Sequence, residues 1–540
     1  MPKPKTLKAT MRPYQAEGFS WLVFLHNADT GGVLADDMGL GKTLQTLAML
    51  CWVKEKRASG GAEEPAPAAA VEEPVKKVKK VVKKRRPTTP RAARRGRGER
   101  SPRAEEGRRD PGPTRPRRGA RALTLVVAPT SVVNNWLREV EKFAPHAQGR
   151  GVDRARPRSA SHELDHADLV ITSYALLRRD EDFLQKYEFD YVILDEAQNI
   201  KNPMSATARA AKKLRSQRRL ALTGTPIENR LSEIWSIFDF LSPGMLGDLT
   251  TFEERYARPI DRGDIEATRR LRAAIKPLVL RRTKGEVAKD LPERIVVERE
   301  CEMPTAQAAL YGQVLSQVRA SLMGEIERQG VAKVQIQILA ALTRLRQAAC
   351  DPRLLKLPGE FSDDDSGKID ALREILSEAV LGGHRTLVFS QFVEMLTLIR
   401  RTLERDGIRY EYLDGSTKDR MERVDRFNND ESIPVFLISL KAGGAGLNLT
   451  GADTVVHVDP WWNPAVEDQA TDRAHRIGQT RVVTAYRLIA RGTIEEKIMH
   501  LSAKKRELVT NVLGAEETGA PKGLTRSDVE MLLSDEPVEA

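Results

Sequence analysis

The stretch GGVLADDMGLGKT, residues 31–43, joins a short apolar run to a glycine-containing loop and then to a helical pattern. The glycines before the lysine let backbone N–H groups approach a phosphate, Lys42 supplies a positive charge, and the hydroxyl of Thr43 can bind Mg²⁺. The common form of this loop, G-x-x-x-x-G-K-[ST], has a glycine where this chain has Asp36. The stretch therefore predicts a phosphate-binding loop, with a simple glycine turn before a helix as the alternative.

An acidic pair follows another apolar run. The run YVILD ends at Asp195, and Glu196 comes next in the sequence DEAQ. One carboxylate can hold Mg²⁺ while its neighbour positions and polarises an attacking water molecule, although acidic residues at strand ends are also common as solvated turns. Together with the phosphate loop, the pair predicts a nucleoside triphosphatase. Thr223 and Thr225, at a further strand end, are either turn hydroxyls or sensors of the nucleotide state.

Short apolar runs alternate with helical patterns along the chain, as in the parallel sheets of α/β domains. In the first half these runs cover residues 31–35, 123–128, 168–173, 191–195 and 219–223. In the second half they cover residues 385–392, 409–415, 434–440, 453–459 and 483–489. The predicted fold class is α/β with two parallel sheets, and ligands are expected beyond the carboxyl ends of their strands.

The charge of the chain is unevenly distributed. Its 540 residues carry 88 Lys plus Arg and 76 Asp plus Glu, a net charge of +12. Residues 61–120 hold 19 of the basic and 8 of the acidic residues, and contain no Leu, Ile, Phe, Trp, Tyr or Met. Such a segment cannot bury enough apolar surface to offset the entropy of ordering, so a disordered basic insert is predicted. A solvated linker and an electrostatic arm for nucleic acid both agree with its composition.

Length, cysteine content and hydropathy exclude several classes of protein. The chain is too long for one core, and its 40% hydrophobic residues exclude fibrous and wholly disordered proteins. Three scattered cysteines, Cys51, Cys301 and Cys350, argue for a reducing compartment. No apolar run is long enough to span a membrane, so no membrane partner is expected. The sequence HELDH at 162–166 matches a zinc pattern, but the proline before it and the strand after it argue against the helix that the pattern needs.

Two segments of the second half also carry chemistry. The first, SLKAGGAGLNLTGA, covers residues 439–452, and the second, QATDRAHRIGQT, covers residues 469–480. In the second segment Arg473 and Arg476 are three residues apart and lie on one helical face. Such a face is usually solvated; the alternative is that both arginines reach the phosphates held by the first α/β domain.

The chain resembles the superfamily 2 helicase-type motors, and among them the Swi/Snf-type chromatin-remodelling ATPases and their bacterial relatives. The resemblance covers residues 7 to about 513 apart from the insert, and in this family an aspartate before MGLGKT is usual. DPWWNP and DRAHRIGQ are its most specific motifs. The matching motifs are RPYQ (12–15), DDMGLGKT (36–43), DEAQNIKN (195–202), LTGTPIENR (222–230), LVFSQF (387–392), LDGST (413–417), GGAGLNLTGAD (443–453), DPWWNP (459–464) and DRAHRIGQ (472–479).

The resemblance implies two RecA-like lobes with helical protrusions, ATP and Mg²⁺ as cofactors, and backbone contacts to double-stranded DNA. Thr43 and Asp195 would hold the metal, and Gln15 would contact adenine. The implied catalytic residues are Lys42, Asp195, Glu196, Arg473 and Arg476. The implied ATP-binding residues are Gln15, Asp37, Met38, Gly39, Leu40, Gly41, Lys42, Thr43 and Gln469. The implied nucleic-acid contacts are Thr172, Ser173, Tyr174, Ser390, Gln391, Gly443, Gly444, Gly446 and Asn448.

The predicted function is that of an ATP-dependent translocase on duplex DNA that remodels protein–DNA complexes. The alternatives are a strand-separating helicase and a nucleic-acid-binding scaffold without turnover. A cytoplasmic, nucleoid-associated monomer is expected, without a substantial N-terminal regulatory domain, and RNA polymerase and nucleoid proteins are candidate partners. The predicted segments are lobe 1 (1–245) with the insert (58–121), a helical protrusion and linker region (246–365), lobe 2 (366–515) and a C-terminal tail (516–540).

Overall fold

The computed structural model describes residues 1–59, 123–147, 149–151, 167–224, 231–331, 333–357, 361–442, 447–461, 464–501 and 526–534. Lys56–Arg121 separates from the rest of the chain as a unit of its own, of which only residues 56–59 are described. The basic insert and the HELDH sequence therefore lie outside the described residues. Within the described ranges, no helix is both long enough and apolar enough to cross a membrane.

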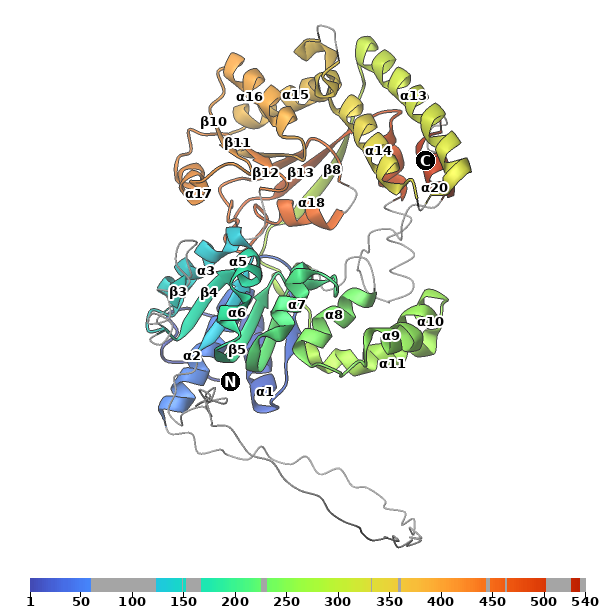
Figure 1. Ribbon diagram of the computed structural model, residues 1–540. Coiled ribbons are helices and arrows are strands. Elements are labelled where there is room, and N and C mark those ends of the chain that lie inside the picture. Colours follow the sequence, from blue (N-terminus) through green and yellow to red (C-terminus); the bar gives the residue numbers. More distant parts are fainter. Residues whose placement is uncertain are drawn as a thin grey trace, which may run out of the picture. The chain divides into compact units, whose positions relative to one another are not determined.

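The first lobe is built on seven strands in the order β3-β4-β2-β5-β6-β1-β7, drawn as arrows in Figure 1. All neighbouring strands are parallel, and Leu34 of β1 lies opposite Leu222 on one side and Leu280 on the other. The loop that follows β1 is therefore flanked by the segments that follow β6 and β7. The strands are β1 (Gly32–Leu34), β2 (Thr124–Ala128), β3 (Gly149–Gly151), β4 (Leu169–Ser173), β5 (Glu188–Asp195), β6 (Arg215–Leu222) and β7 (Val279–Leu280).

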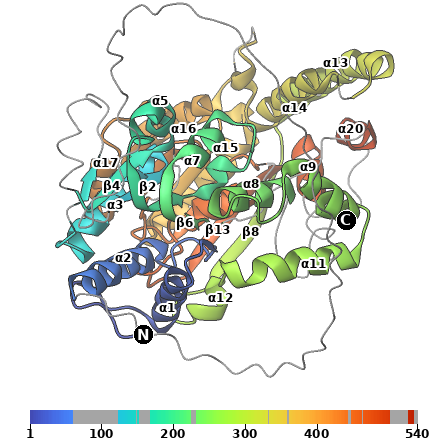
Figure 2. The same ribbon diagram turned by 60° about the horizontal axis from the view of Figure 1, so that its bottom comes forward.

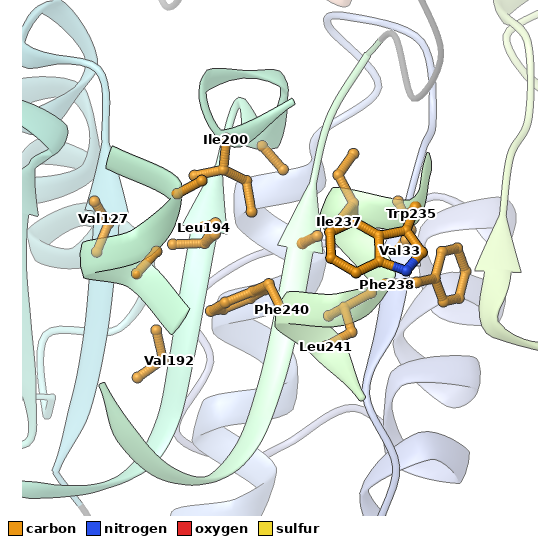
Figure 3. Close-up of a cluster of buried hydrophobic side chains, with 14 of the residues drawn as sticks. Val33, Val127, Val192, Leu194, Ile200, Trp235, Ile237, Phe238, Phe240 and Leu241 are labelled. Carbon is orange, nitrogen blue, oxygen red and sulfur yellow. The ribbon is translucent and has the colours of Figure 1, made fainter. Parts of the chain in front are cut away.

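Both faces of this sheet are covered by helices, which explains why its central strands are continuous apolar runs. Val127 and Leu194 belong to one face, where they share a buried cluster with Phe240 (Figure 3). Their neighbours along the strands, Val126 and Ile193, belong to the cluster on the other face. The first cluster includes residues of α5 (Tyr174–Arg179), α7 (Ala206–Lys213) and α8 (Leu231–Leu241), and the second includes residues of α1 (Pro13–Asn27), α2 (Lys42–Ala58) and α3 (Thr130–Phe143).

The second lobe repeats this arrangement on six parallel strands in the order β10-β11-β9-β12-β13-β8. Val388 and Leu437 pack with α15 (Gly367–Leu381) and α16 (Val393–Arg405) on one face. Phe389 and Ile438 pack with residues of α17 (Arg420–Asn429) and α18 (Pro464–Thr471) on the other. The strands are β8 (Arg294–Cys301), β9 (Thr386–Ser390), β10 (Tyr410–Leu413), β11 (Val435–Ser439), β12 (Thr454–His457) and β13 (Val483–Ala490).

Further helices lie outside the two sheets. The long pair α13 (Thr305–Gln329) and α14 (Gln335–Cys350) lies side by side (Figure 2) and shares a core with α20 (Arg526–Leu532). The helices α9 (Leu249–Phe252), α10 (Arg258–Asp261) and α11 (Ile265–Ile275), with the π-helix η2 (Glu253–Ala257), extend the core of the first lobe. The remaining short elements are α6 (Glu181–Leu184), α12 (Lys284–Val287), η1 (Ala197–Ile200), η3 (Lys276–Leu278), η4 (Pro352–Leu355) and η5 (Asp363–Asp365).

The predicted fold class, α/β with two parallel sheets, is confirmed, and each predicted apolar run overlaps a strand. Sequence reasoning missed β3, β7 and β8. Both β7 and β8 fall inside residues 246–365, which were assigned to helices and a linker. β8 is an edge strand, and it exposes Ile295 and Val296 and continues into charged residues, so it lacks the long apolar run of a central strand. The domain bounds stay predictions.

Candidate active site

The loop between β1 and α2 surrounds the amino group of its own lysine. Gly39 and Gly41 have φ angles of 85° and 80°, left-handed values that would strain a residue with a side chain. Nζ of Lys42 donates hydrogen bonds to the carbonyl oxygens of Asp36 (2.6 Å) and Asp37 (3.3 Å). The loop thus places a positive charge beside the backbone N–H groups at the start of α2, as binding of a phosphate requires.

Asp36, which stands where the common loop pattern has glycine, is fully buried. Its carboxylate accepts hydrogen bonds from Arg282 at 2.5 and 3.0 Å and from Gln45 at 3.2 Å. Arg282 also donates to Gln45 and to the backbone carbonyl of Tyr14. Because a bidentate pair offsets the cost of burying both charges, this ion pair fixes the loop to the segment that follows β7. Sequence reasoning missed Arg282, whose partner lies 246 residues away along the chain.

The acidic pair at the end of β5 is held by several hydrogen bonds. Oδ2 of Asp195 accepts one from the indole N–H of Trp136 (2.7 Å), and Oδ1 accepts one from the backbone N–H of Glu196 (3.0 Å). Burial raises the pKa of Asp195, while Trp136 and the charge of Lys42 oppose the rise. Glu196 has φ 50° and ψ 57°. A residue with a side chain pays about 1–3 kcal/mol for this left-handed conformation, and such strain clusters at functional sites.

Glu196 is also connected to residues beyond two other strands. Its Oε2 accepts a hydrogen bond from the side-chain amide of Gln198 (2.8 Å), whose Oε1 accepts one from the hydroxyl of Thr223 (2.9 Å). The hydroxyl of Tyr174 donates to the carbonyl oxygen of Asp195 at 2.8 Å. Thr223 follows β6 and Tyr174 follows β4, so the acidic pair is tied to the ends of both strands.

A third carboxylate lies at the loop, and sequence reasoning missed it. The carboxylate of Glu139 of α3 accepts a hydrogen bond from the side-chain amide of Asn135 (2.9 Å), and the side chain of Thr43 helps to lower the pKa of Glu139. Burial raises the pKa of Glu139, and the Asn135 bond and the guanidinium of Arg476 oppose the rise. Trp136 and Glu139 are three residues apart in one helix and so face the same site. That spacing, directly after a predicted strand, is the pattern from which both could have been found.

Arg473 brings a charge of the second lobe to the same site. It is only 5% exposed, and its guanidinium lies over the ring of Phe389 at 5.5 Å from the ring centroid. Burial lowers the pKa of Arg473 to about 10, and the charge of Glu196 opposes the fall. Nε and one terminal nitrogen of Arg473 have no hydrogen-bond partner in the part of the chain that the structure describes. A buried guanidinium in this condition is suited to a negatively charged ligand.

Arg476 lies against the phosphate loop. A Cβ atom added to Gly39 would be 2.8 Å from the Cβ of Arg476, so the backbone of the loop approaches this arginine closely. The guanidinium of Arg476 donates to the carbonyl of Leu447 (3.3 Å) and is attracted by the charge of Glu139. The structure thus brings the predicted catalytic residues of both lobes to one place, around Lys42.

The chemistry of these groups fits ATP with Mg²⁺. The loop offers N–H donors and an ammonium to phosphates, and the arginines add guanidinium groups. The hydroxyl of Thr43 and the carboxylate of Asp195 are hard oxygen ligands of the kind that Mg²⁺ prefers, and Mg²⁺ commonly combines one or two such ligands with substrate phosphates and water.

Two family descriptions match the chain in succession. Residues 14–354 match the SNF2-related domain, and residues 367–478 match the helicase conserved C-terminal domain. The chain belongs to the SNF2-related family. The predicted membership among Swi/Snf-type proteins of superfamily 2 is confirmed, and so is the predicted enzyme class, that of the helicase-like ATPases.

Individual relatives cover nearly all of this SNF2-related chain. The putative ATP-dependent helicase/translocase YwqA of Bacillus subtilis is 37% identical over 95% of this chain and 50% of its own length. The TATA-binding protein-associated factor MOT1 of Saccharomyces cerevisiae is 34% identical over 96% of this chain and 28% of its own length. A solved structure of the Sulfolobus solfataricus SWI2/SNF2 ATPase core in complex with dsDNA is 36% identical, with coverage of 95% of this chain and 94% of that chain and a TM-score of 0.44. The chain thus spans half or less of the length of these two curated relatives.

Gln15, which the SNF2-type resemblance assigns to adenine, is buried against the phosphate loop. Its side-chain amide donates to the carbonyl of Leu40 (3.1 Å), and its Oε1 accepts from the backbone N–H of Arg12 (2.9 Å). The hydroxyl of Tyr14 donates to the same carbonyl of Leu40 at 3.0 Å. These bonds couple the start of α1 to the loop, and contact of Gln15 with adenine stays a prediction.

The other predicted nucleotide-binding residues also lie near the loop or on α18. The carboxylate of Asp37 accepts a hydrogen bond from the backbone N–H of Lys284 (3.0 Å). The side chain of Met38 approaches the end of β6, where a Cβ added to Gly224 would be 2.9 Å from its Cγ. Gln469 is half-buried on α18. Their contacts with a nucleotide stay predictions.

The predicted nucleic-acid contacts at the end of β4 are buried. Thr172 lies inside the strand, and the hydroxyl of Ser173 caps α5 by accepting a hydrogen bond from the N–H of Leu176 (3.3 Å). Tyr174 is engaged with the acidic pair. Contact of this segment with DNA stays a prediction.

The predicted nucleic-acid contacts of the second lobe differ in exposure. Ser390 is buried at the end of β9, and Asn448 is exposed. Gln391 donates its backbone N–H to the carboxylate of Asp459 (3.2 Å) and accepts a hydrogen bond from Arg346 of α14 (3.1 Å). Outside the described residues lie Gly443, Gly444, Gly446 and Thr225.

Proposed function

We propose that this chain hydrolyses ATP and uses the energy to translocate on duplex DNA, remodelling protein–DNA complexes. The observation that carries the proposal is Arg473, a buried arginine next to Glu196 with two nitrogen atoms that have no partner within the described residues. Burying guanidinium donors without hydrogen-bond acceptors is costly, so such a side chain is expected where a ligand supplies acceptors and further negative charge. A γ-phosphate held by Lys42 brings that charge.

The residues of the first lobe have distinct roles in this hydrolysis. Lys42 and the N–H groups of the loop bind the β- and γ-phosphates. Thr43 and Asp195 would hold Mg²⁺, which when bound neutralises phosphate charge. Glu196, whose carboxylate is fixed by Gln198, orients the attacking water and accepts its proton.

The arginines act on the charge that develops during the transfer. Arg473 and Arg476 stabilise the transition state, in which negative charge is spread over the equatorial oxygens of the transferring phosphoryl group and develops on the oxygen that leaves with ADP. Both arginines belong to the second lobe, whereas the loop belongs to the first. Loss of the γ-phosphate therefore weakens the contact between the lobes, and repeated hydrolysis drives a cycle of closing and opening.

The predicted DNA-contacting segment 172–174 has a direct path to the reaction. Tyr174 donates its hydroxyl hydrogen to the carbonyl oxygen of Asp195. A movement of this segment on a DNA backbone would shift the strained turn that carries Glu196. This connection supports stimulation of hydrolysis by DNA.

The names of the relatives support a motor that acts on DNA-bound protein. YwqA is named as a putative helicase/translocase, and MOT1 is named for association with the TATA-binding protein. We infer that this chain moves on DNA and that its target is a protein–DNA complex. RNA polymerase and nucleoid proteins are the candidate targets.

ATP hydrolysis measured with no polymer, single-stranded DNA, duplex DNA and RNA tests the proposal, together with a strand-displacement assay on the same samples. We expect duplex DNA to stimulate hydrolysis most, without displacement of a strand. Displacement would select a helicase instead. Absence of turnover with every polymer would select a scaffold and refute the proposal.

A further inference from the structure

One segment of the chain connects the two sheets and contacts the active site on its way. Residues 281–293, here called the crossover segment, follow β7, which pairs with β1 in the first sheet. They precede β8, which pairs with β13 in the second sheet. The crossover segment contains the one-turn helix α12. Its contacts bear on how the two lobes share one site.

The beginning of the crossover segment is anchored to the phosphate loop. Besides its buried ion pair, Arg282 accepts a hydrogen bond at its carbonyl oxygen from the N–H of Asp37 (3.1 Å). The N–H of Lys284 in turn donates to the carboxylate of Asp37 (3.0 Å). A capping box between Thr283 and Glu286 fixes the first turn of α12. The backbone of Lys284 is therefore held in place relative to the loop.

The side chain of Lys284 extends from this anchor to residues 472–476, here called the arginine segment. Its ammonium donates to Oδ1 of Asp472 (2.6 Å) and to the carbonyl oxygen of His475 (2.5 Å). The Lys284 side chain is 11% exposed, so water screens this charge-assisted contact only weakly. Lys284 thus holds the loop with its backbone and the arginine segment with its side chain.

The rest of the crossover segment adds contacts to the same region. Nε2 of His475 lies 2.8 Å from the carbonyl oxygen of Pro292. Ala288 is buried in a small cluster with Leu40 of the phosphate loop, and Ile477 packs against that cluster. The crossover segment therefore lies between the phosphate loop and the arginine segment, in contact with both.

We propose that Lys284 is a positioning residue that sets the place of Arg473 and Arg476 relative to the phosphate loop. The two atoms that its ammonium holds belong to Asp472 and His475, each of which directly precedes one of the arginines. Lys284 acts through these neighbours. The inference rests on the proposed hydrolysis of ATP and deepens it.

The consequence is a specific kinetic pattern. The arginines act mainly on the transition state, whereas bound nucleotide is held by the loop, whose tie to Arg282 does not depend on the side chain of Lys284. Loss of the ammonium should therefore lower kcat more than it lowers nucleotide affinity.

Lys284→Met tests this, because methionine keeps an unbranched side chain and removes the ammonium. Lys289→Met, which changes an exposed lysine of the same segment, is the matched control. We expect Lys284→Met to lower kcat at least about tenfold, while KM and the Kd of a fluorescent ADP analogue change less than about threefold. Lys289→Met should match the wild type, and Lys284→Arg, which keeps the charge, should recover part of kcat.

Hydrogen exchange gives a readout that does not need turnover. The backbone N–H groups of Arg473, Ala474 and His475 all donate hydrogen bonds within the local turn. They should exchange faster in Lys284→Met and in Asp472→Asn, which removes the negative charge of the same contact, but not in Lys289→Met.

Either of two results would overturn the role of Lys284. One is a kcat within about twofold of the wild type together with unchanged exchange in both variants. The other is a nucleotide affinity that falls in parallel with kcat, because that would show a general distortion of the loop. A wild type without ATP hydrolysis would refute the proposed function instead, and the exchange experiment would still decide whether Lys284 holds the arginine segment.

Discussion

The acidic pair and the arginine segment lie at the same loop but differ in how their polar atoms are satisfied. Both carboxylate oxygens of Asp195 accept hydrogen bonds, and the carboxylate of Glu196 accepts one from Gln198. Arg473 is buried to a similar degree, yet two of its nitrogen atoms have no partner within the described residues. The acidic pair is thus held by hydrogen bonds from the first lobe, whereas Arg473 keeps two nitrogen donors that no described residue satisfies.

The difference in hydrogen bonding suits the two regions to different tasks in ATP hydrolysis. The acidic side is fixed by bonds that need no ligand, so it is preorganised for the reaction. The arginine side still has unsatisfied donors on Arg473, so its interaction with the loop strengthens when the loop holds a negatively charged ligand. A motor needs both properties: a rigid reaction centre and a partner element that responds to the nucleotide.

The largest expected effect comes from Glu196→Gln, which removes one carboxylate of the acidic pair. The amide cannot accept the proton of the attacking water, so hydrolysis should fall about 10⁴-fold while ATP still binds. Single-turnover hydrolysis and equilibrium binding of ATP measure the two quantities. Glu188→Gln, at the exposed beginning of the same strand, is the control and should behave as the wild type. Normal turnover by Glu196→Gln would exclude Glu196 as the base.

Arg473→Ala breaks the arginine side and should lower kcat about 10³-fold, because it removes a charge that acts on the transferring phosphoryl group. ATP affinity should change much less. Arg473→Lys should restore little, since an ammonium lacks the planar donor arrangement of a guanidinium and loses its proton more readily when buried. Arg491→Ala removes an exposed arginine of the second lobe and serves as control. Equal losses in kcat and in affinity would show that Arg473 binds nucleotide uniformly.

Asp36→Asn tests the buried ion pair that fixes the phosphate loop, at which both sides meet, to Arg282. It leaves the charge of Arg282 buried without its partner, so the free energy of unfolding should fall by about 3–5 kcal/mol. Asp36→Gly, which restores the common loop pattern, should also destabilise the protein for the same reason. Asp290→Asn breaks an exposed ion pair, in which the side chain of Arg12 is 34% exposed and that of Asp290 is 65% exposed. This variant should lower the free energy of unfolding much less. Urea unfolding followed by tryptophan fluorescence compares the three variants, and equal midpoints would contradict the role given to the buried pair.

The parts of the site that could be predicted are those carried by local patterns. The phosphate loop and the pair Asp195 and Glu196 each follow a buried apolar run, and such runs are visible because helices cover both faces of each sheet. Arg473 and Arg476 were predicted from their spacing and from a family motif. In these cases the chemistry and the structural context lie within a few residues of one another.

The parts that were missed depend on contacts between distant residues. Arg282 meets Asp36 across 246 positions, and Lys284 meets Asp472 across 188. Nothing in the local spacing of LRRTKGE shows that Arg282 turns toward the loop and Lys284 toward the arginine segment. Edge strand β8 was missed because it lacks a continuous apolar run. Long-range ion pairs and edge strands are determined by tertiary packing, which no short window of sequence contains.

The smallest expected effect is that of deleting residues 61–120, which belong neither to the acidic pair nor to the arginine segment. The deletion removes 19 basic and 8 acidic residues but no group of the active site, so kcat at saturating DNA should stay within about twofold of the wild type. If the segment binds DNA, affinity at low salt should fall, and the slope of log affinity against log salt should become less steep by about 0.9 for each DNA phosphate that the segment neutralises in the wild type. Binding to a short duplex over a range of salt concentrations measures both quantities. An unchanged affinity and slope would show that the segment is a linker. The DNA-binding groups would then have to lie on the remainder of the chain, which is nearly neutral. There the shape of the surface and backbone N–H groups would contribute more to DNA binding than net charge does.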